Sequence, residues 1–197
     1  MAERRGGAER RTGETAVKVA LDLSGGTFRA STGIGFFEHM LEQLSRHAGI
    51  GLEVEAKGDL HVDAHHTVED VGLAIGEALD RALGDRTGVE RFGFAFAPLD
   101  EALARAVVDL SGRAYCRYDL AREVATAFVT QGFPLTLVGE FWRAVATRAR
   151  LTMHLDLERA SDPHHAAEAL FKAAALALRQ AVRITGEAVP STKGTLS

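Results

Sequence analysis

Cysteine is nearly absent from this chain of 197 residues, which has one, Cys116. A single cysteine excludes a disulfide within the chain and a thiolate-rich zinc site, so any metal chemistry must use histidine and carboxylate ligands. Long apolar runs are also missing, because none reaches the roughly 18 residues that span a bilayer. Residues 1–13 lack the hydrophobic stretch of a signal peptide. The sequence therefore predicts a cytoplasmic protein with no membrane partner.

An excess of positive charge is missing as well. Lysine and arginine number 23 against 27 aspartates and glutamates, which gives a formal charge of −4. This balance argues against a polyanion-binding surface, so we expect no nucleic-acid partner, although a small basic cluster can still hold one phosphate group. The 46% hydrophobic content is enough for a buried core.

The chain contains an internal duplication. Glu14 and the segment 22–25 recur as Glu101 and the segment 109–112, at a constant offset of 87. Four polar positions recur at an offset of 99: Asp63, His65, His66 and Glu69 become Asp162, His164, His165 and Glu168. The second half therefore holds an insertion of 12 residues, which we place between Arg113 and Pro134, where residues 115–132 are irregular and have no counterpart.

Apolar periodicity predicts the elements of each half. Residues 16–23 alternate as a strand, a Gly25-Gly26 turn leads to a partner strand at 28–32, and a helix (36–48), a strand (50–56) and a long helix (64–83) follow. The long helix has a twin at 163–183, where Asp162 suits the N-cap and Pro163 the first helical position.

These elements predict an α+β fold with two similar half-domains, each a mixed sheet of about four strands packed against two helices. We expect the first half to span residues 11–88 and the second 89–189. The charged, glycine-bearing segment 1–10 is predicted to be disordered, and 190–197 to form a C-terminal phosphate-binding tail.

The two His-His-x-x-Glu segments stand at matching helix starts. Because residues advance about 100° each around a helix, His65 and Glu69 share a face and His66 points elsewhere, so one helix can serve two metal ions. The pair His164 and Glu168, with His165, repeats this geometry. Each ion could take a histidine and a glutamate from one helix and the odd histidine from the other, within a chain or between chains, and the sequence leaves the pairing open.

Imidazole and carboxylate ligands suit manganese or iron, with zinc as a close competitor. A single pair of histidines at a helix start is more often solvent-exposed and inert. Retention of all four polar positions in both halves favours metal binding over that reading.

Six motifs follow one another over nearly the whole chain. They are Arg11-Thr12-Gly13-Glu14-Thr15, Phe36-Phe37-Glu38-His39-Met40-Leu41, Gly58-Asp59-Leu60-His61 with His65-His66-Thr67-Val68-Glu69-Asp70, Ala97-Pro98-Leu99-Asp100-Glu101-Ala102, Asp109-Leu110-Ser111-Gly112-Arg113, and Pro190-Ser191-Thr192-Lys193-Gly194. In this order they resemble the motifs of imidazoleglycerol-phosphate dehydratases. Departures from the family pattern are few: Phe37-Glu38 replaces a commoner Leu-Asp, Ala64 replaces a frequent Asp, and residues 94–96 are unusually apolar.

The resemblance implies loss of water from imidazole glycerol phosphate, with two Mn²⁺ ions per active site. The proton to be removed sits on a carbon that no carbonyl acidifies. Metal ions at both ring nitrogens would favour an imidazolate that expels the side-chain hydroxyl through a diazafulvene-like intermediate, and loss of a second proton then gives an enol. Family precedent assigns metal ligation to His39, His65, His66, Glu69, His154, His164, His165 and Glu168.

Two of these ligands rest on the resemblance alone. The repeat alignment pairs His39 with Val138 and His154 with Glu55, so neither histidine is duplicated. For a lone histidine, a structural role is otherwise the better expectation.

Glu14 is the candidate catalytic acid/base and a substrate contact by the same resemblance. Its repeat partner Glu101 leaves open that the pair is a structural signature of the fold. The resemblance also points to phosphate-binding residues, whose guanidinium, hydroxyl and ammonium groups suit that anion. These are Arg91, Arg113, Ser191 and Lys193. Gln43 and His47, on the helix of His39, are further candidates for substrate contact, although they could equally be ordinary surface residues.

Family members assemble as shells of 24 subunits with active sites between chains, so the resemblance implies a homo-oligomer. Two other classes use the same ligands. A metal-dependent hydrolase would activate water and cleave phosphoesters, and a non-catalytic metal-storage module would bind metal without turnover.

Overall fold

The first half of the chain folds into a four-stranded sheet and two helices. The computed structural model describes residues 4–120, 124 and 126–196. Val17, Val19 and Leu21 alternate with exposed residues along one strand, so only one face of this sheet is buried. Strand order is β1-β2-β4-β3. The elements are β1 (Arg5–Arg11), β2 (Thr15–Asp22), β3 (Phe28–Ser31), α1 (Gly35–Ala48), β4 (Gly51–Gly58) and α2 (His65–Leu83).

The second half repeats this arrangement in a sheet of order β5-β6-β10-β7. Its long helix begins at Pro163, and the Asp162 side chain accepts hydrogen bonds from the amides of His164 and His165, as the sequence predicted for an N-cap. The elements are β5 (Phe92–Leu99), β6 (Ala102–Asp109), β7 (Tyr115–Asp119), β8 (Phe128–Thr130), β9 (Phe133–Pro134), α4 (Thr136–Ala149), β10 (Thr152–Arg159) and α5 (Pro163–Ala181).

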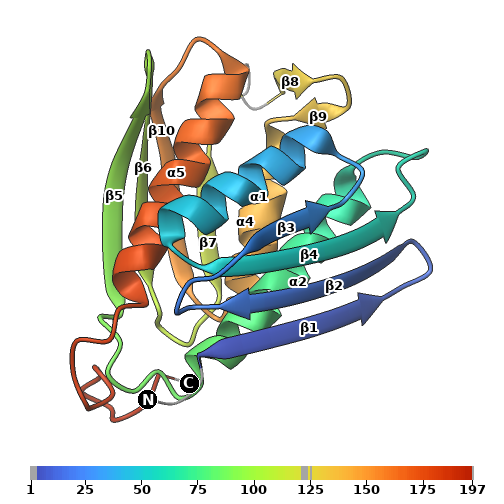
Figure 1. Cartoon of the computed structure of the whole chain (residues 1–197). Coiled ribbons are helices and arrows are strands. Elements are labelled where there is room, and N and C mark those ends of the chain that lie inside the picture. Colours follow the sequence, from blue (N-terminus) through green and yellow to red (C-terminus); the bar gives the residue numbers. More distant parts are fainter. Residues whose placement is uncertain (1–3, 121–123, 125, 197) are drawn as a thin grey trace.

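The helices lie between the two sheets (Figure 1). Helix α2 packs on β1 and β2, and α5 packs on β5 and β6. The shorter helices cross over, because α1 of the first half lies against α5 and α4 of the second half lies against α2. The α+β fold with two related halves is confirmed, and the halves share one core. In the part of the chain that is described, no helix is both long and apolar enough to cross a membrane.

Two predictions for the first half are wrong. Residues 1–10 were expected to be disordered, but Arg5–Arg11 form β1, which pairs antiparallel with β2 along its whole length and buries Ala8. Residues 1–3 lie outside the described residues. The strand at 28–32 was expected to pair with its predecessor, whereas β3 pairs parallel with β4, which separates it from β2. Parallel pairing follows because α1 provides the crossover between β3 and β4.

The insertion lies where the sequence predicted it. Three residues, 32–34, link β3 to α1, whereas sixteen, 120–135, link β7 to α4 and include the β8-β9 hairpin. Residues 121–123 and 125 lie outside the described residues. Tyr115–Asp119 is not irregular as expected, since it forms β7, the counterpart of β3.

Two glycines, Gly6 and Gly93, make equivalent close contacts in the two halves. A Cβ at Gly6 would lie 1.9 Å from the carbonyl oxygen of Ala78, and one at Gly93 would lie 1.9 Å from that of Ala177. The two glycines differ by the offset of 87 and the two alanines by 99. Each long helix therefore lies directly on the edge strand of its own sheet.

We expect Gly6→Ala and Gly93→Ala each to destabilise the fold by about 1–3 kcal/mol, because the added methyl group overpacks against backbone. Chemical denaturation measures the free energy of unfolding. Gly186→Ala is the matched control, since nothing lies within 4 Å of its Cβ position. Equal stability of Gly6→Ala and the control would contradict the packing described here.

Candidate metal centre and active site

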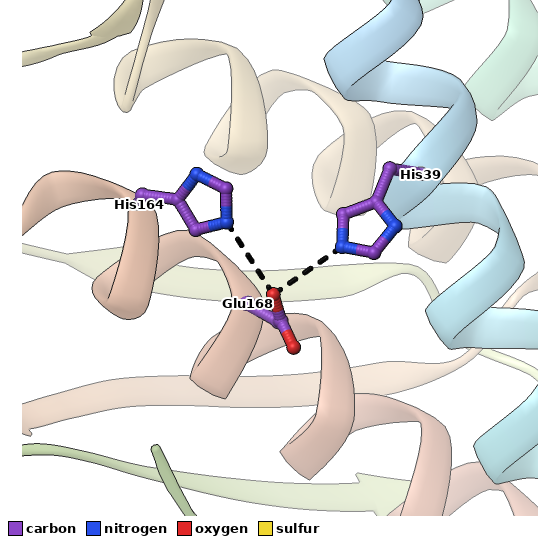
Figure 2. Close-up of side chains that lie close together, drawn as sticks. All are labelled: His39, His164 and Glu168. Carbon is purple, nitrogen blue, oxygen red and sulfur yellow. Dashed lines mark hydrogen bonds and ion pairs between the residues drawn. The ribbon is translucent and has the colours of Figure 1, made fainter. Parts of the chain in front are cut away.

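His39, His164 and Glu168 converge between α1 and α5 (Figure 2). The Nε2 atoms of His39 and His164 lie 3.4 and 3.5 Å from Oε2 of Glu168, and one ligand atom from each residue lies within 4.8 Å of the others. Among the described residues this is the one group of three or more histidines, cysteines and carboxylates so arranged. It joins both halves, because α1 crosses onto α5.

The chemistry of this donor set fits a divalent ion. Separations of 3.4 and 3.5 Å are long for hydrogen bonds, whereas ligands about 2.0–2.6 Å from a shared ion leave roughly 3–3.7 Å between neighbouring ligand atoms. Lys172 Nζ lies 2.6 Å from Oε1 of Glu168, the oxygen turned away from the histidines. Burial opposes ionisation of Glu168, but the hydrogen bond from Lys172 and the nearby His39 outweigh it and lower its pKa.

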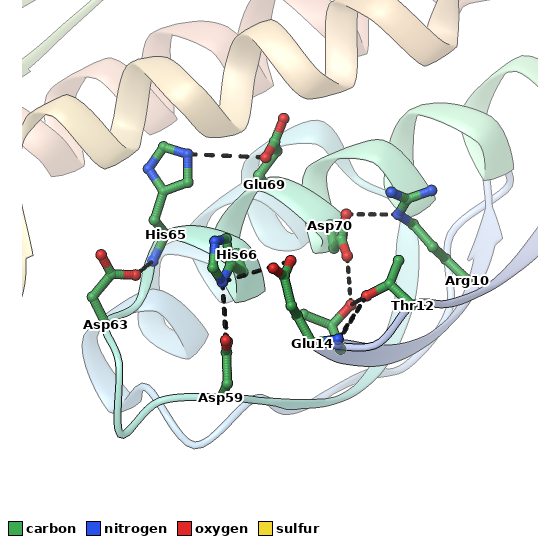
Figure 3. Close-up of polar contacts among 10 residues, drawn as sticks. Arg10, Thr12, Glu14, Asp59, Asp63, His65, His66, Glu69 and Asp70 are labelled. Carbon is green, nitrogen blue, oxygen red and sulfur yellow. Dashed lines mark hydrogen bonds and ion pairs between the residues drawn. The ribbon is translucent and has the colours of Figure 1, made fainter.

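In the matching segment at the start of α2 (Figure 3), the glutamate is more exposed, at 47% for Glu69 against 12% for Glu168. His65 Nε2 lies 3.9 Å from Oε2 of Glu69 on the same helix face, as the spacing predicted, and both side chains are nearly half exposed. His66 points the other way, and its Nδ1 lies 3.0 Å from Asp59 and 3.7 Å from Oε2 of Glu14. The hydrogen bond to Asp59, opposed by desolvation and aided by Glu14, raises the pKa of His66.

His165 is held in the same way in the second half. Its Nδ1 lies 2.8 Å from Oε2 of Glu101, whose Oε1 accepts hydrogen bonds from the amides of Ser161 and Asp162. The hydrogen bond with His165, together with these amides, lowers the pKa of Glu101 to about 2, and Glu101 raises the pKa of His165. A carboxylate at Nδ1 orients each ring, and Nε2 of His165 lies 4.0 Å from Oδ2 of the exposed Asp100.

The Glu101–His165 pair predicts a pH dependence in metal-free protein. Ionised Glu101 contributes to the stability of the folded protein above its ordinary pKa of 4.5, and this contribution is lost as pH falls toward 2. Protonated His165 contributes to the same stability below pH 6.5, and its contribution is lost as pH rises through its raised pKa. The pair therefore stabilises α5 most between pH 4.5 and 6.5. NMR titration should give His165 a pKa above 6.5 that Glu101→Gln lowers, whereas Glu187→Gln leaves it unchanged.

His154 lies apart from the other predicted ligands. Its neighbours Met153 and Leu155 are fully buried, so alternation along β10 turns His154 to the outer face of the second sheet. There its ring lies 5.6 Å from that of Tyr115. Val107 on β6 is directly opposite and is 40% exposed. His154 therefore does not join the cluster of its own chain.

The predicted substrate contacts fall in three places. Glu14 stands in the β1-β2 turn beside His66, with its side chain 57% exposed. Gln43 and His47 form a pair on α1, with Oε1 and Nε2 3.0 Å apart. Burial first, and then the positive charges of Lys172 and Arg46, lower the pKa of His47.

The four predicted phosphate-binding residues gather at the other end of α5. Arg91 donates to Asp109 at 2.8 Å and to the carbonyl of Pro190 at 2.7 Å, which holds the tail and Ser191 next to it. Arg113 bonds to Ser111, two residues beyond Asp109, and the Lys193 amide donates to Ser191. The amide of Arg91 also donates to the carbonyl of Ala181, the last residue of α5, so about 20 Å of helix separates this group from Glu168.

Comparison of this chain with known proteins identifies one family. The family model described as imidazoleglycerol-phosphate dehydratase matches residues 32–178. A relative of that name from Halorhodospira halophila is 53% identical over 200 residues, which covers both chains completely. The chain belongs to the imidazoleglycerol-phosphate dehydratase family. It is therefore a hydro-lyase of histidine biosynthesis.

Solved dehydratases of this family have the same fold. The Staphylococcus aureus enzyme superposes with a TM-score of 0.77 at 37% identity, covering 92% of this chain and 99% of that one. The Pyrococcus furiosus enzyme, crystallised with the compound (S)-C348, gives a TM-score of 0.83 at 34% identity and covers 96% and 100% of the two chains.

Two residues of the site, Lys172 and Asp59, had no role assigned from the sequence. Lys172 stands four residues after Glu168, a spacing that signals a helical ion pair. Its repeat counterpart is Leu73, so a search for duplicated positions passes over it. Asp59 lies seven residues before His66 in a loop, and only the folded chain brings the two together.

Proposed function

We propose that this dehydratase works by a dimanganese, imidazolate-based elimination of water from imidazole glycerol phosphate. The observation that carries the proposal is the convergence of His39, His164 and Glu168 across the two halves. The donors are two imidazoles and one carboxylate held by Lys172. With no cysteine among them, this set suits manganese.

Two ions would be held by related but unequal sets of ligands. His39, His164 and Glu168 would hold one, and His65 and Glu69 the other. When bound, manganese would supply Lewis acidity that favours loss of a proton from the imidazole ring. The position of His39 is taken by Val138 in the second half, so the His65 and Glu69 set lacks a third ligand of that kind.

The residues of the chain would do the remaining work. Glu14, beside His66 at the open end of the β1-β2 turn, would give a proton to the hydroxyl that departs as water and then take the proton from carbon whose loss gives the enol. His66 and His165, each with Nδ1 on a carboxylate, would present Nε2 to the site. Gln43 and His47 would contact the substrate from α1.

A single chain cannot bring all these groups to one small substrate. The phosphate-binding group of Arg91, Arg113, Ser191 and Lys193 lies about 20 Å along α5 from Glu168, and His154 is on the opposite face of its sheet. We infer that active sites form between chains of a homo-oligomer of 24 subunits. His154 and the phosphate-binding residues would then complete the site of a neighbouring copy.

The experiment that tests this function follows imidazole acetol phosphate formation in metal-stripped protein before and after Mn²⁺ is restored. We expect no turnover without metal and recovery with it. A metal-stripped enzyme that runs at full rate contradicts the proposal. Phosphoester cleavage without dehydration would favour a hydrolase, and manganese uptake without turnover would favour a storage module.

A further inference from the structure

A polar network centred on the buried residues Thr15 and Asp70 ties the β1-β2 turn to α2 (Figure 3). Arg10 Nε donates to Oδ1 of Asp70 at 2.6 Å, and the Thr15 hydroxyl donates to Oδ2 of the same carboxylate. The Asp70 side chain is only 9% exposed. Both oxygens of Asp70 therefore hold residues that flank the turn of Glu14.

The network reaches the backbone of Glu14 through Thr12. The Thr12 hydroxyl lies 3.3 Å from that of Thr15 and accepts hydrogen bonds from the amides of Glu14 at 3.2 Å and Thr15 at 3.0 Å. A chain of contacts thus runs from Asp70 through the two threonines to the amide of Glu14.

The second half has a hairpin at the equivalent position without this network. The repeat counterparts of Arg10, Thr12, Thr15 and Asp70 are Ala97, Leu99, Ala102 and Ala169. Strands β5 and β6 still pair up to the turn, with Leu99 opposite Ala102. The fold of the hairpin therefore does not require the polar network.

The two repeat-related glutamates differ in how they are held. Glu101 accepts hydrogen bonds from two amides and from His165, so these bonds fix the position of its carboxylate directly. The Glu14 carboxylate lies 3.7 Å from His66 and remains largely exposed. In the first half the Glu14 carboxylate is therefore exposed, and it is the backbone amide of Glu14 that is held, by its hydrogen bond to Thr12.

We propose that Asp70, with Arg10, is a positioning residue that holds the Glu14 backbone and so keeps the carboxylate beside His66 without engaging it. This inference rests on the proposed proton-transfer role of Glu14. Misplacing a reacting group by about 1 Å costs about 100-fold in rate. A group held through its backbone keeps its place while its oxygens stay free for protons.

A double-mutant cycle tests the proposal. Asp70→Asn should lower kcat by about 10- to 100-fold with KM little changed. In the Glu14→Gln background the same change should lower kcat less than about 2-fold, because there is no longer a proton-transferring carboxylate to position. Asp22→Asn is the matched control, since it breaks the Arg5–Asp22 pair at the far end of the same two strands and should leave kcat unchanged.

A second variant installs the apolar set of the second half: Arg10→Ala, Thr12→Leu, Thr15→Ala and Asp70→Ala. It should fold and bind Mn²⁺ as the native chain does, because apolar residues replace a complete polar network, and should show the low kcat of Asp70→Asn. Native kcat in this variant, or an equal fall of kcat in both backgrounds of the cycle, overturns the proposal.

Amide hydrogen exchange at Glu14 and Thr15 separates failure of this inference from failure of the proposed function. Faster exchange in Asp70→Asn together with a fully active Glu14→Gln removes the proton-transfer role of Glu14 and leaves the holding role of Asp70. Unchanged exchange in Asp70→Asn overturns the holding role, whatever the rates are.

Discussion

Glu14→Gln should lower kcat by about 10²–10⁴-fold, the usual contribution of a positioned general acid or base. The amide keeps the size of the carboxylate but cannot accept the proton that leaves carbon. Because Glu14 is exposed and its side chain forms a single ion pair with the described residues, with His66 at 3.7 Å, we expect stability and Mn²⁺ affinity to stay close to native. Steady-state dehydration kinetics, thermal denaturation and a manganese titration measure the three quantities.

Two controls frame this result. Glu9→Gln changes an exposed glutamate of β1 that pairs with Lys18 and should leave kcat unchanged. Glu101→Gln changes the repeat counterpart of Glu14. It should instead lower Mn²⁺ affinity and the stability of the first turn of α5, because Glu101 accepts hydrogen bonds from His165 and from the amides of Ser161 and Asp162. Equal losses of kcat in Glu14→Gln and Glu9→Gln would remove the acid/base assignment.

Glu168→Gln should weaken one of two manganese sites by at least about 100-fold, since even residues that only support metal ligands contribute 10–100-fold. The substitution removes the negative charge between His39 and His164 and leaves Lys172 without its ion-pair partner. Dehydration should fall with metal occupancy. Titration followed by the electron paramagnetic resonance of free Mn²⁺ counts the sites and gives their affinities.

The duplication supplies the control for this prediction. Glu69→Gln should weaken the other site and leave the Glu168 site intact, and the double variant should lose both. Glu140→Gln, on the surface of α4 beside Arg143, should change neither. Two sites of native affinity in Glu168→Gln would contradict the assignment of this cluster to metal.

Local pattern was sufficient for most elements and for the chemistry of the ligands. The apolar stripes of α2 and α5, the N-cap at Asp162 and the spacing of His65 and Glu69 all depend on residues a few positions apart, so the sequence predicted them. The duplicated polar positions identified the His-His-x-x-Glu motif that we propose binds metal, because both copies retain it.

Two features of the first sheet depended on contacts between distant residues. Strand β1 looks disordered because its Arg5-Gly6-Gly7 start has little apolar character, and its stability comes from pairing with β2 and the close approach of α2. Strand β3 pairs with β4 because α1 provides a crossover, which the Gly25-Gly26 turn does not reveal.

By itself the sequence determined the two-fold repeat, the fold class and the kind of atoms that would bind metal. Only the tertiary structure decided that His39 joins His164 and Glu168, that His154 faces away, and that Asp70 reaches Thr15. Local patterns depend on backbone geometry over one or two turns. The choice of which helix lies on which follows instead from burying apolar faces that are distant in sequence, and here α1 crosses onto the helix of the other half.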